Sequence, residues 1–534
     1  MKTFKINTLM IVAWIGCVTF LLTPAFGQLI DATKAPNTIN EGIHKSLIEE
    51  IGAGRGDIMI EDSSLFIINR DTFRAIRRGR QLFQRKFTRE QGQGPLFGDG
   101  SGNINIDLAI GAGLADSCAA CHGRPRGSAG FGGDVATRPD SRDSPHLFGL
   151  GLKEMLADEI TADLRAIRAK ALAKAISKNK PVTMELVSKE IKYGQITANP
   201  DGSFNTSQVQ GVNADLRVRP FFAQGGTISI REFIVGALKN EMGLEAVDPD
   251  LDTASKGGTI TTPSGMVLDG NHSHADYDQI EAPPTADPAA DLDGDGVKNE
   301  IPESIVDYYE FYLLNYFDPA TYEQTERTEN GRKLFKKISC GRCHIPDLQI
   351  DRDRRVADIG AVYDPVKGIM NNLFATATTS YVEVTDGSGF PPLKTPALQP
   401  TLVQDIFTDF KRHDLGPNFY ERNYDGTMQK EFLTRALWGV GSTAPYGHDG
   451  RSINLTEVIL RHGGEAQTAR DAFADLKADK RSDILEFLNS QVLFPPDDTA
   501  SNLNPGNRNA PGFPQVGHGS ISLTVLFNNP NDIE

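Results

Sequence analysis

The sequence predicts a mainly α-helical protein in which two similar units are joined by long loops. Residues 153–177 are rich in Ala, Leu, Lys, Glu and Arg and contain neither Pro nor Gly, which predicts one long helix. The pattern Gly-Arg-x-Leu-Phe occurs at 79–83 and again at 331–335, which indicates an internal duplication of a helical segment. Within 477–492 apolar residues recur at helical spacing, which predicts a helix that packs against the C-terminal unit.

The composition limits the classes of protein to consider. The chain has 534 residues, of which 39% are hydrophobic and 23% charged, enough to bury a sizeable core. This length allows about two to four domains. A net charge of −15 argues against a nucleic-acid partner, and five cysteines are too few for a disulfide scaffold.

The N-terminus resembles a secretory signal peptide. Lys2 and Lys5 precede an apolar stretch at 9–22, and the small residues at 23–27 suggest cleavage before Gln28. A membrane anchor is the alternative, but the apolar run is short for the roughly 20 residues of a spanning helix. No later segment is long and apolar enough to span a bilayer, so we expect a periplasmic or secreted protein.

The composition also changes along the chain in a way that suggests five parts. Residues 253–302 are rich in Asp, Pro, Gly and Thr and are typical of a connection between domains. We expect a signal peptide at 1–27, an N-terminal domain with insertions at 28–252, an acidic linker at 253–302, a C-terminal domain at 303–495 and an irregular tail at 496–534.

The cysteines after the signal segment occur only in two Cys-x-x-Cys-His runs. The first is Cys118, Cys121 and His122, and the second is Cys340, Cys343 and His344. This run is the attachment signature of c-type haem, because two thiols add to the vinyl groups and the adjacent His then binds the iron.

Disulfides or a zinc site are the alternatives, but neither requires a His directly after each cysteine pair. The predicted fold is therefore mainly α, with two cytochrome c-type domains, each around one covalent haem c, and with long loops and insertions. The first domain differs from the second by a Gly-rich insertion at about 91–113.

With these motifs in place, the chain resembles the bacterial di-haem cytochrome c peroxidase superfamily, in particular its exported di-haem oxidoreductase branch. The resemblance runs from about Asp71 to Leu493 and is most specific at 443–450, Thr-Ala-Pro-Tyr-Gly-His-Asp-Gly. In the peroxidases the residue fourteen positions after the His of this motif is the sixth ligand of the C-terminal haem, commonly Met. Here that residue is His462, whereas His448 itself is expected beside the site rather than on the iron.

Two imidazoles on one iron would give a low-spin haem of lowered potential, suited to relaying electrons. The alternative role of His462 is that of a cation at a helix end, since Gly463 and Gly464 mark a helix stop.

The N-terminal haem is expected to be open. In the peroxidases a displaceable His lies eight residues before the Asn of an Arg-Asn-x-Pro motif, which is matched here by 142–145. Val135 stands at that position, so the resemblance implies no resting sixth ligand. His146 is the rival candidate, and its alternative role is a polar residue packed near the haem edge.

The resemblance also implies a distal catalytic carboxylate. Residues 240–242 match the stretch of the family that carries it, so Glu241 is the candidate for moving protons to and from bound peroxide. A solvated helix end is its alternative role. Residues 229–232 predict a capping box, which gives Glu232 a structural role. Phe233 stands where the family has a Gln, which makes the pocket more apolar.

A further departure concerns the path between the haems. The related enzymes place a Trp there, but the matching residue here is Ala223. Trp438 is expected to pack near the second haem.

Two Ca²⁺ sites are predicted. The first is the inter-haem site that the resemblance implies, at Asp143, Thr443 and Pro445. The second is an acidic loop at 291–299 whose spacing is typical of a Ca²⁺ loop and whose ligands would be Asp291, Asp293, Asp295 and Asn299. Pro302 stands at the twelfth position, so Glu300 or Glu303 would have to close this site. A solvated acidic loop is the alternative.

The resemblance predicts an exported peroxidase-type di-haem oxidoreductase. Electrons from a donor cytochrome c or a small copper protein would enter at the C-terminal haem and reduce peroxide at the N-terminal haem. Two alternatives stay open: an O₂-activating oxygenase similar to the di-haem rubber oxygenases, and an electron carrier without turnover.

Overall fold

The computed structural model describes residues 47–94, 115–123, 129, 144–271, 278–315, 320–321, 324–363, 373–423 and 426–493. The predicted signal peptide, most of the Gly-rich insertion, Val135, Asp143 and the C-terminal tail lie outside these residues. Within them, no helix combines the length and the hydropathy of a membrane span. The division into domains remains a prediction.

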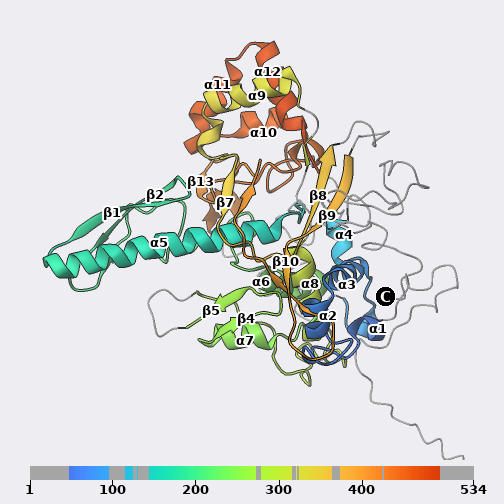
Figure 1. Cartoon of the computed structure of the whole chain (residues 1–534). Coiled ribbons are helices and arrows are strands. Elements are labelled where there is room, and N and C mark those ends of the chain that lie inside the picture. The colour runs from blue at the N-terminus through green and yellow to red at the C-terminus, as the bar shows by residue number, and fades with distance from the viewer. Residues whose placement is uncertain are drawn as a thin grey trace, which may run out of the picture.

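The helices form two groups. In Figure 1 the N-terminal helices gather at one end of the body and the C-terminal helices at the other. The first group comprises α1 (Leu47–Ile51), α2 (Ser64–Arg70), α3 (Thr72–Gln84), α4 (Cys118–His122), α6 (Ile230–Met242), α7 (Pro249–Ser255) and α8 (Glu303–Leu314). The second comprises α9 (Glu326–Lys337), α10 (Leu455–Arg461), α11 (Gln467–Ala474) and α12 (Ala478–Asn489).

The predicted mainly α fold is wrong, because the protein also contains many short strands. About 38% of the described residues are helical and 17% are in strands. The strands form small antiparallel sheets rather than one large sheet. They are β1 (Val182–Ser188), β2 (Ile191–Ala198), β3 (Phe204–Asn205), β4 (Thr259–Thr261), β5 (Val267–Asp269), β6 (Ala320–Thr321), β7 (Leu348–Ile350), β8 (Ala357–Tyr363), β9 (Leu373–Thr379), β10 (Tyr381–Val384), β11 (Leu393–Pro396), β12 (Thr401–Val403), β13 (Arg412–Asp414), β14 (Glu421–Arg422), β15 (Met428–Gln429), β16 (Glu431–Leu433) and β17 (Gln491–Val492).

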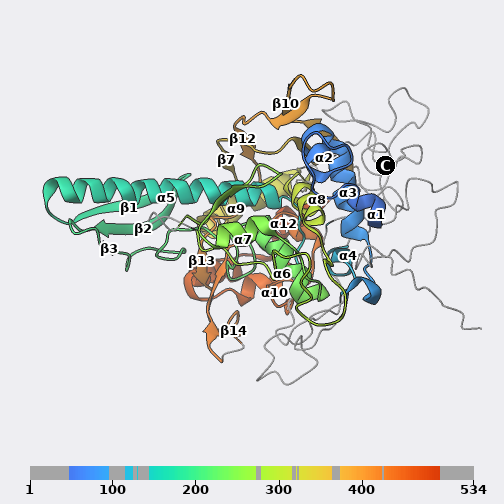
Figure 2. The same cartoon turned by 90° about the horizontal axis from the view of Figure 1, so that it is seen from below.

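The clearest cause of this error is the hairpin of β1 and β2. Its two strands are rich in β-branched and aromatic residues, and they are joined by Lys189 and Glu190 alone. Both turn residues have positive φ, 47° and 65°, as the tight turns of antiparallel hairpins require. This hairpin lies along α5 (Leu150–Lys178), and together they project from the body as an arm in both Figure 1 and Figure 2.

Four predicted helices are confirmed. Helix α5 contains the predicted segment 153–177 and ends at Lys178. The following residue, Asn179, is left-handed (φ 44°) and donates to the carbonyls of Ala175 and Ile176. Helices α3 and α9 contain the two Gly-Arg-x-Leu-Phe patterns, and α12 lies within the predicted segment 477–492.

The repeated glycine has a packing role in both units. A Cβ atom on Gly79 would lie 2.4 Å from the carbonyl oxygen of Tyr308 on α8. A Cβ atom on Gly331 would lie 2.0 Å from the carbonyl oxygen of Asp483 on α12. The shared pattern therefore marks the same close contact of two helices, α3 with α8 and α9 with α12.

Candidate haem sites

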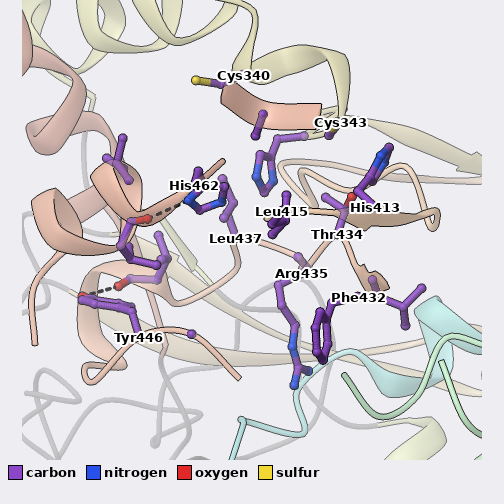
Figure 3. Close-up of a pocket in the computed structure, with 18 of the residues that line it drawn as sticks. Cys340, Cys343, His413, Leu415, Phe432, Thr434, Arg435, Leu437, Tyr446 and His462 are labelled. Atoms are coloured by element: carbon purple, nitrogen blue, oxygen red, sulfur yellow. Dashed lines mark hydrogen bonds between the residues drawn. The ribbon is translucent and has the colours of Figure 1, made fainter. Parts of the chain in front are cut away.

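The second Cys-x-x-Cys-His run lines a cavity of about 450 Å³. Cys340 begins a short 3₁₀ helix (Cys340–Arg342) that follows α9, and Cys343 and His344 come directly after it. Helix α10 delivers His462 to the same cavity, and Figure 3 shows Cys340, Cys343 and His462 around it. The structure thus brings together the four predicted residues of this site from two distant segments.

Both histidines present the same nitrogen to the backbone. His344 Nδ1 lies 3.0 Å from the carbonyl oxygen of Phe407. His462 Nδ1 lies 2.6 Å from the carbonyl oxygen of Val458, and a dashed line from His462 marks this bond in Figure 3. A carbonyl only accepts, so Nδ1 carries the proton in each ring, and Nε2 is the atom with a lone pair. A ring held in this way is oriented as in metal sites, where the nitrogen that does not bind the metal donates to a carbonyl or a carboxylate.

The two imidazoles are also held in the neutral form that binds iron. Burial lowers the pKa of His344 to about 4, and the nearby ring of His462 lowers it further against the opposing effect of the Phe407 carbonyl. Burial likewise lowers the pKa of His462. A neutral ring does not fit the alternative role of His462 as a helix-end cation, although its Nδ1 does bond a carbonyl of the last turn of α10.

Cationic side chains on the cavity wall suit the carboxylates of a haem. Lys153 from α5 is half-buried over the ring of Trp438, with its Nζ atom 5.8 Å from the ring centre. Burial lowers the pKa of Lys153 to about 7, and Arg435 lowers it further. Among the described residues Lys153 forms no ion pair with a carboxylate, so an anionic group of a ligand would be its natural partner. Sequence reasoning missed this residue, since nothing in its spacing connects it to the haem motifs.

His448 and Trp438 lie where the sequence suggested. His448 is buried at the cavity wall and stacks on Phe432, with ring centres 4.1 Å apart. Trp438 is also buried there and donates from Nε1 to the carbonyl of Gln404 at 3.3 Å. Thr443 and Pro445 line the same cavity, but Asp143 lies outside the described residues, so the inter-haem Ca²⁺ site remains a prediction.

The first Cys-x-x-Cys-His run forms helix α4. Ser117 caps this helix by accepting from the amide of Ala120 at 3.1 Å. His122 Nδ1 lies 2.8 Å from the carbonyl oxygen of Pro145, the same arrangement that holds His344. Burial raises the pKa of Cys118 to about 12, so both thiols of this run are embedded rather than solvated surface groups.

Glu241 lies close to this first run. Burial raises the pKa of Cys121 to about 11, and the carboxylate of Glu241 contributes to that rise. The amide of Ala115 donates to the carbonyl of Glu241 at 3.1 Å, which ties the segment before the run to the end of α6. The half-buried side chain of Glu241 therefore stands beside the candidate haem rather than at an isolated helix end.

Glu232, nine residues earlier, has the structural role predicted for it. Its carboxylate accepts from the amides of Ile228 and Ser229, both at 3.2 Å, and from the amide of Glu281 at 3.0 Å. The predicted capping box is confirmed, because Ser229 accepts from the amide of Glu232 in return. Phe233 packs against Phe222, with ring centres 5.3 Å apart, and Ala223 lines the wall of the C-terminal cavity.

His146 is engaged through both ring nitrogens. Its Nδ1 accepts from the amide of Phe148 at 3.2 Å, and its Nε2 donates to the carbonyl of Trp438 at 2.9 Å. This half-buried ring connects the segment after the first Cys-x-x-Cys-His run to the wall of the C-terminal cavity.

Two sites of this kind define the class of protein, an oxidoreductase with two haems. Residues 366–491 match the model of the family described as di-haem oxidoreductase, putative peroxidase. The match confirms the predicted relationship. It covers less than a quarter of the chain, including the motif at 443–450 and His462 but neither Cys-x-x-Cys-His run.

Two solved structures are similar to parts of this chain. Hydrazine synthase of Kuenenia stuttgartiensis is 16% identical, with a TM-score of 0.22, over 37% of this chain and 58% of that one. A MauG-like protein associated with microbial copper homeostasis is 18% identical, with a TM-score of 0.19, over 35% of this chain and 53% of that one. This chain thus spans little more than half of either protein, and scores this low support no argument about function. No curated protein matches the chain.

Proposed function

We propose that this protein is an exported di-haem c oxidoreductase of the peroxidase type. The observation that carries the proposal is the pair His344 and His462 on one cavity, both neutral and both held at Nδ1 by a backbone carbonyl. Such a pair suits an electron-relay site, whereas His122 suits the site where peroxide is reduced.

The two haems would supply the redox chemistry, with electrons accepted at the C-terminal site and delivered to peroxide at the N-terminal site. The cysteines of each run would attach them covalently. Carbonyl acceptors would keep His122, His344 and His462 in the tautomer that offers Nε2 to iron. Glu241 would take a proton from peroxide and return it to the leaving oxygen.

The remaining parts of the proposal follow the predictions from sequence. The reductant is a donor cytochrome c or a small copper protein, and the compartment is the periplasm or the exterior of the cell. The apolar surroundings of Phe233 are the one observation that favours an oxygenase as the second candidate, because apolar side chains favour an apolar substrate.

Electron paramagnetic resonance of the purified ferric protein tests the proposal. We expect one low-spin and one high-spin haem, with the high-spin signal consumed by H₂O₂. His462→Gln should convert the low-spin signal to high spin, whereas His448→Gln, on the same cavity wall, should leave it unchanged. Two low-spin haems that do not respond to peroxide would overturn the proposal in favour of an electron carrier, and a stable O₂ adduct of the reduced protein would favour the oxygenase.

A further inference from the structure

The loop at 291–299 gathers three carboxylates. Asp291, Asp293 and Asp295 each place one oxygen within 4.8 Å of the others. The backbone of the loop wraps around them: Asp291 accepts from the amides of Gly294 at 2.9 Å and Gly296 at 3.2 Å. Exposed acidic loops of this kind are common, so this arrangement alone does not define a site.

Glu300 supplies an independent observation. Its side chain is fully buried, and its Oε2 atom accepts from the amide of Glu245 at 2.6 Å. Its Oε1 atom has no access to water and no hydrogen-bond partner among the described residues. This carboxylate also lies within 4.8 Å of those of Glu245 and Asp293, so Asp293 is common to both clusters. A buried oxygen without a partner is costly unless a cation meets it.

The five carboxylates form no close pairs with the basic side chains that the structure describes, and only Lys239 has an electrostatic effect on one of them, Glu245. In the part of the chain that the structure describes, none of them forms an ion pair with Lys or Arg. Among the described residues, no ion pair therefore compensates the charge of this group.

We propose that Asp291, Asp293, Asp295, Glu245 and Glu300 form a Ca²⁺ site. Ca²⁺ takes about six to eight oxygen ligands in flexible geometry, which suits carboxylates from one loop and two flanking segments. Glu300 closes the site, whereas Glu303 lies 3.4 Å from Arg55 in an ion pair. Glu245 is a ligand that the loop sequence could not reveal, because it lies 46 positions before Asp291.

This site ties the acidic loop to the end of α6. Glu245 follows α6 closely, and its carbonyl accepts from the amide of Ile301 at 3.2 Å. Its carboxylate accepts from the amide of Leu292 at 3.1 Å. Bound Ca²⁺ would therefore hold the end of the helix that carries Glu241. An effect of bound Ca²⁺ on catalysis through Glu241 rests on the proposed function, whereas the binding of Ca²⁺ does not.

Calorimetric titration of the chelator-treated holoprotein with CaCl₂ tests the site. We expect Glu300→Gln and Asp293→Asn to weaken one Ca²⁺ site by about 10- to 100-fold. Glu185→Gln, an exposed carboxylate on β1, is the matched control and should bind like the original protein. Any inter-haem Ca²⁺ site is present in all variants, so it cancels in the comparison. Equal stoichiometry and affinity in all four proteins would overturn the proposal.

Thermal unfolding separates a lost ligand from a misfolded variant. Because Gln has nearly the same size as Glu, Glu300→Gln should leave the Tm in chelator close to that of the original protein, and it should abolish the further rise that Ca²⁺ gives the original protein. A Ca²⁺-dependent rise that persists in Glu300→Gln would contradict the proposal.

Amide hydrogen exchange tests the coupling without measuring turnover. Ca²⁺ should slow exchange at 244–247 and 291–301 in the original protein but not in Glu300→Gln. If Ca²⁺ slows exchange but the protein has no peroxidase activity, the Ca²⁺ site is supported and the proposed function is rejected. Exchange that does not respond to Ca²⁺ would reject the coupling.

Discussion

His146 donates from Nε2 to the backbone carbonyl of Trp438 at 2.9 Å, across 292 positions of sequence. This bond joins the segment that follows the first haem motif to the wall of the cavity at the second. The other nitrogen accepts from the amide of Phe148, and burial lowers the pKa of the ring well below its usual value. These contacts make His146 a neutral bridge between the two segments. Its two predicted roles, a polar residue near the haem edge and an iron ligand, both stay predictions.

Replacing His146 should lower stability without changing the haem spectrum. His146→Leu leaves the Trp438 carbonyl without its donor in a buried position, which should cost about 1–3 kcal/mol in the free energy of unfolding. Chemical denaturation measures that loss, and electron paramagnetic resonance reports the spin states. A new high-spin signal in the variant would show that His146 binds iron after all.

Replacing Lys153 should change the reduction potential of a haem in the C-terminal cavity. Removing one nearby positive charge favours the ferric state, so Lys153→Met should lower the potential on the order of 50 mV. Potentiometric titration measures the change. Lys170→Met, an exposed residue of the same helix, is the control and should leave the potential unchanged.

The lowered pKa of Lys153 predicts that the reduction potential of this haem depends on pH. Since its pKa is lowered to about 7 by burial, Lys153 loses its charge as the pH rises above that value, and the potential should fall with it. Lys153→Met has no such charge to lose. A slope that is equal in the original protein and in Lys153→Met would contradict this role.

Replacing Glu241 should affect catalysis, whereas replacing Glu232 should affect stability. Glu241→Gln should lower peroxide turnover about 100-fold or more, the usual scale of a proton-transfer residue, with little change in the free energy of unfolding. Glu232→Ala leaves three backbone amides without their acceptor and should cost about 2 kcal/mol or more. Steady-state kinetics with H₂O₂ and urea unfolding of both variants measure the two effects. Equal turnover in Glu241→Gln and the original protein would remove Glu241 from the mechanism.

Arg231 should be among the residues most important for stability. It is fully buried between Asp248 at 2.7 Å, Asp307 at 3.0 Å and Glu310 at 3.1 Å, which joins α6 to α8. Arg231→Met leaves these buried carboxylates uncompensated and should cost about 3–5 kcal/mol. Arg451→Met is the exposed control. A loss below about 1 kcal/mol, the usual scale of a surface ion pair, would contradict this role.

The sequence predicted the long helices correctly but not the fold class. Helices α5 and α12 have continuous patterns of strong helix formers or apolar spacing, so local propensity determines them. The short strands of the C-terminal half have too few residues for a clear period, and their pairing depends on partners elsewhere in the chain. β7, for example, pairs with β12, about fifty positions further on.

What the sequence by itself predicted is the class of chemistry and the residues that would carry it. This prediction used local patterns: the two Cys-x-x-Cys-His runs, the motif at 443–450 and the position of His462. Local patterns can be recognised in a sequence before its fold is known. The tertiary structure alone decided which groups meet: Lys153 at the haem cavity, His146 on Trp438, and Glu245 and Glu300 on the acidic loop. These contacts join segments far apart in the chain, and burial, which sets the charge of each group, exists only after the chain has folded.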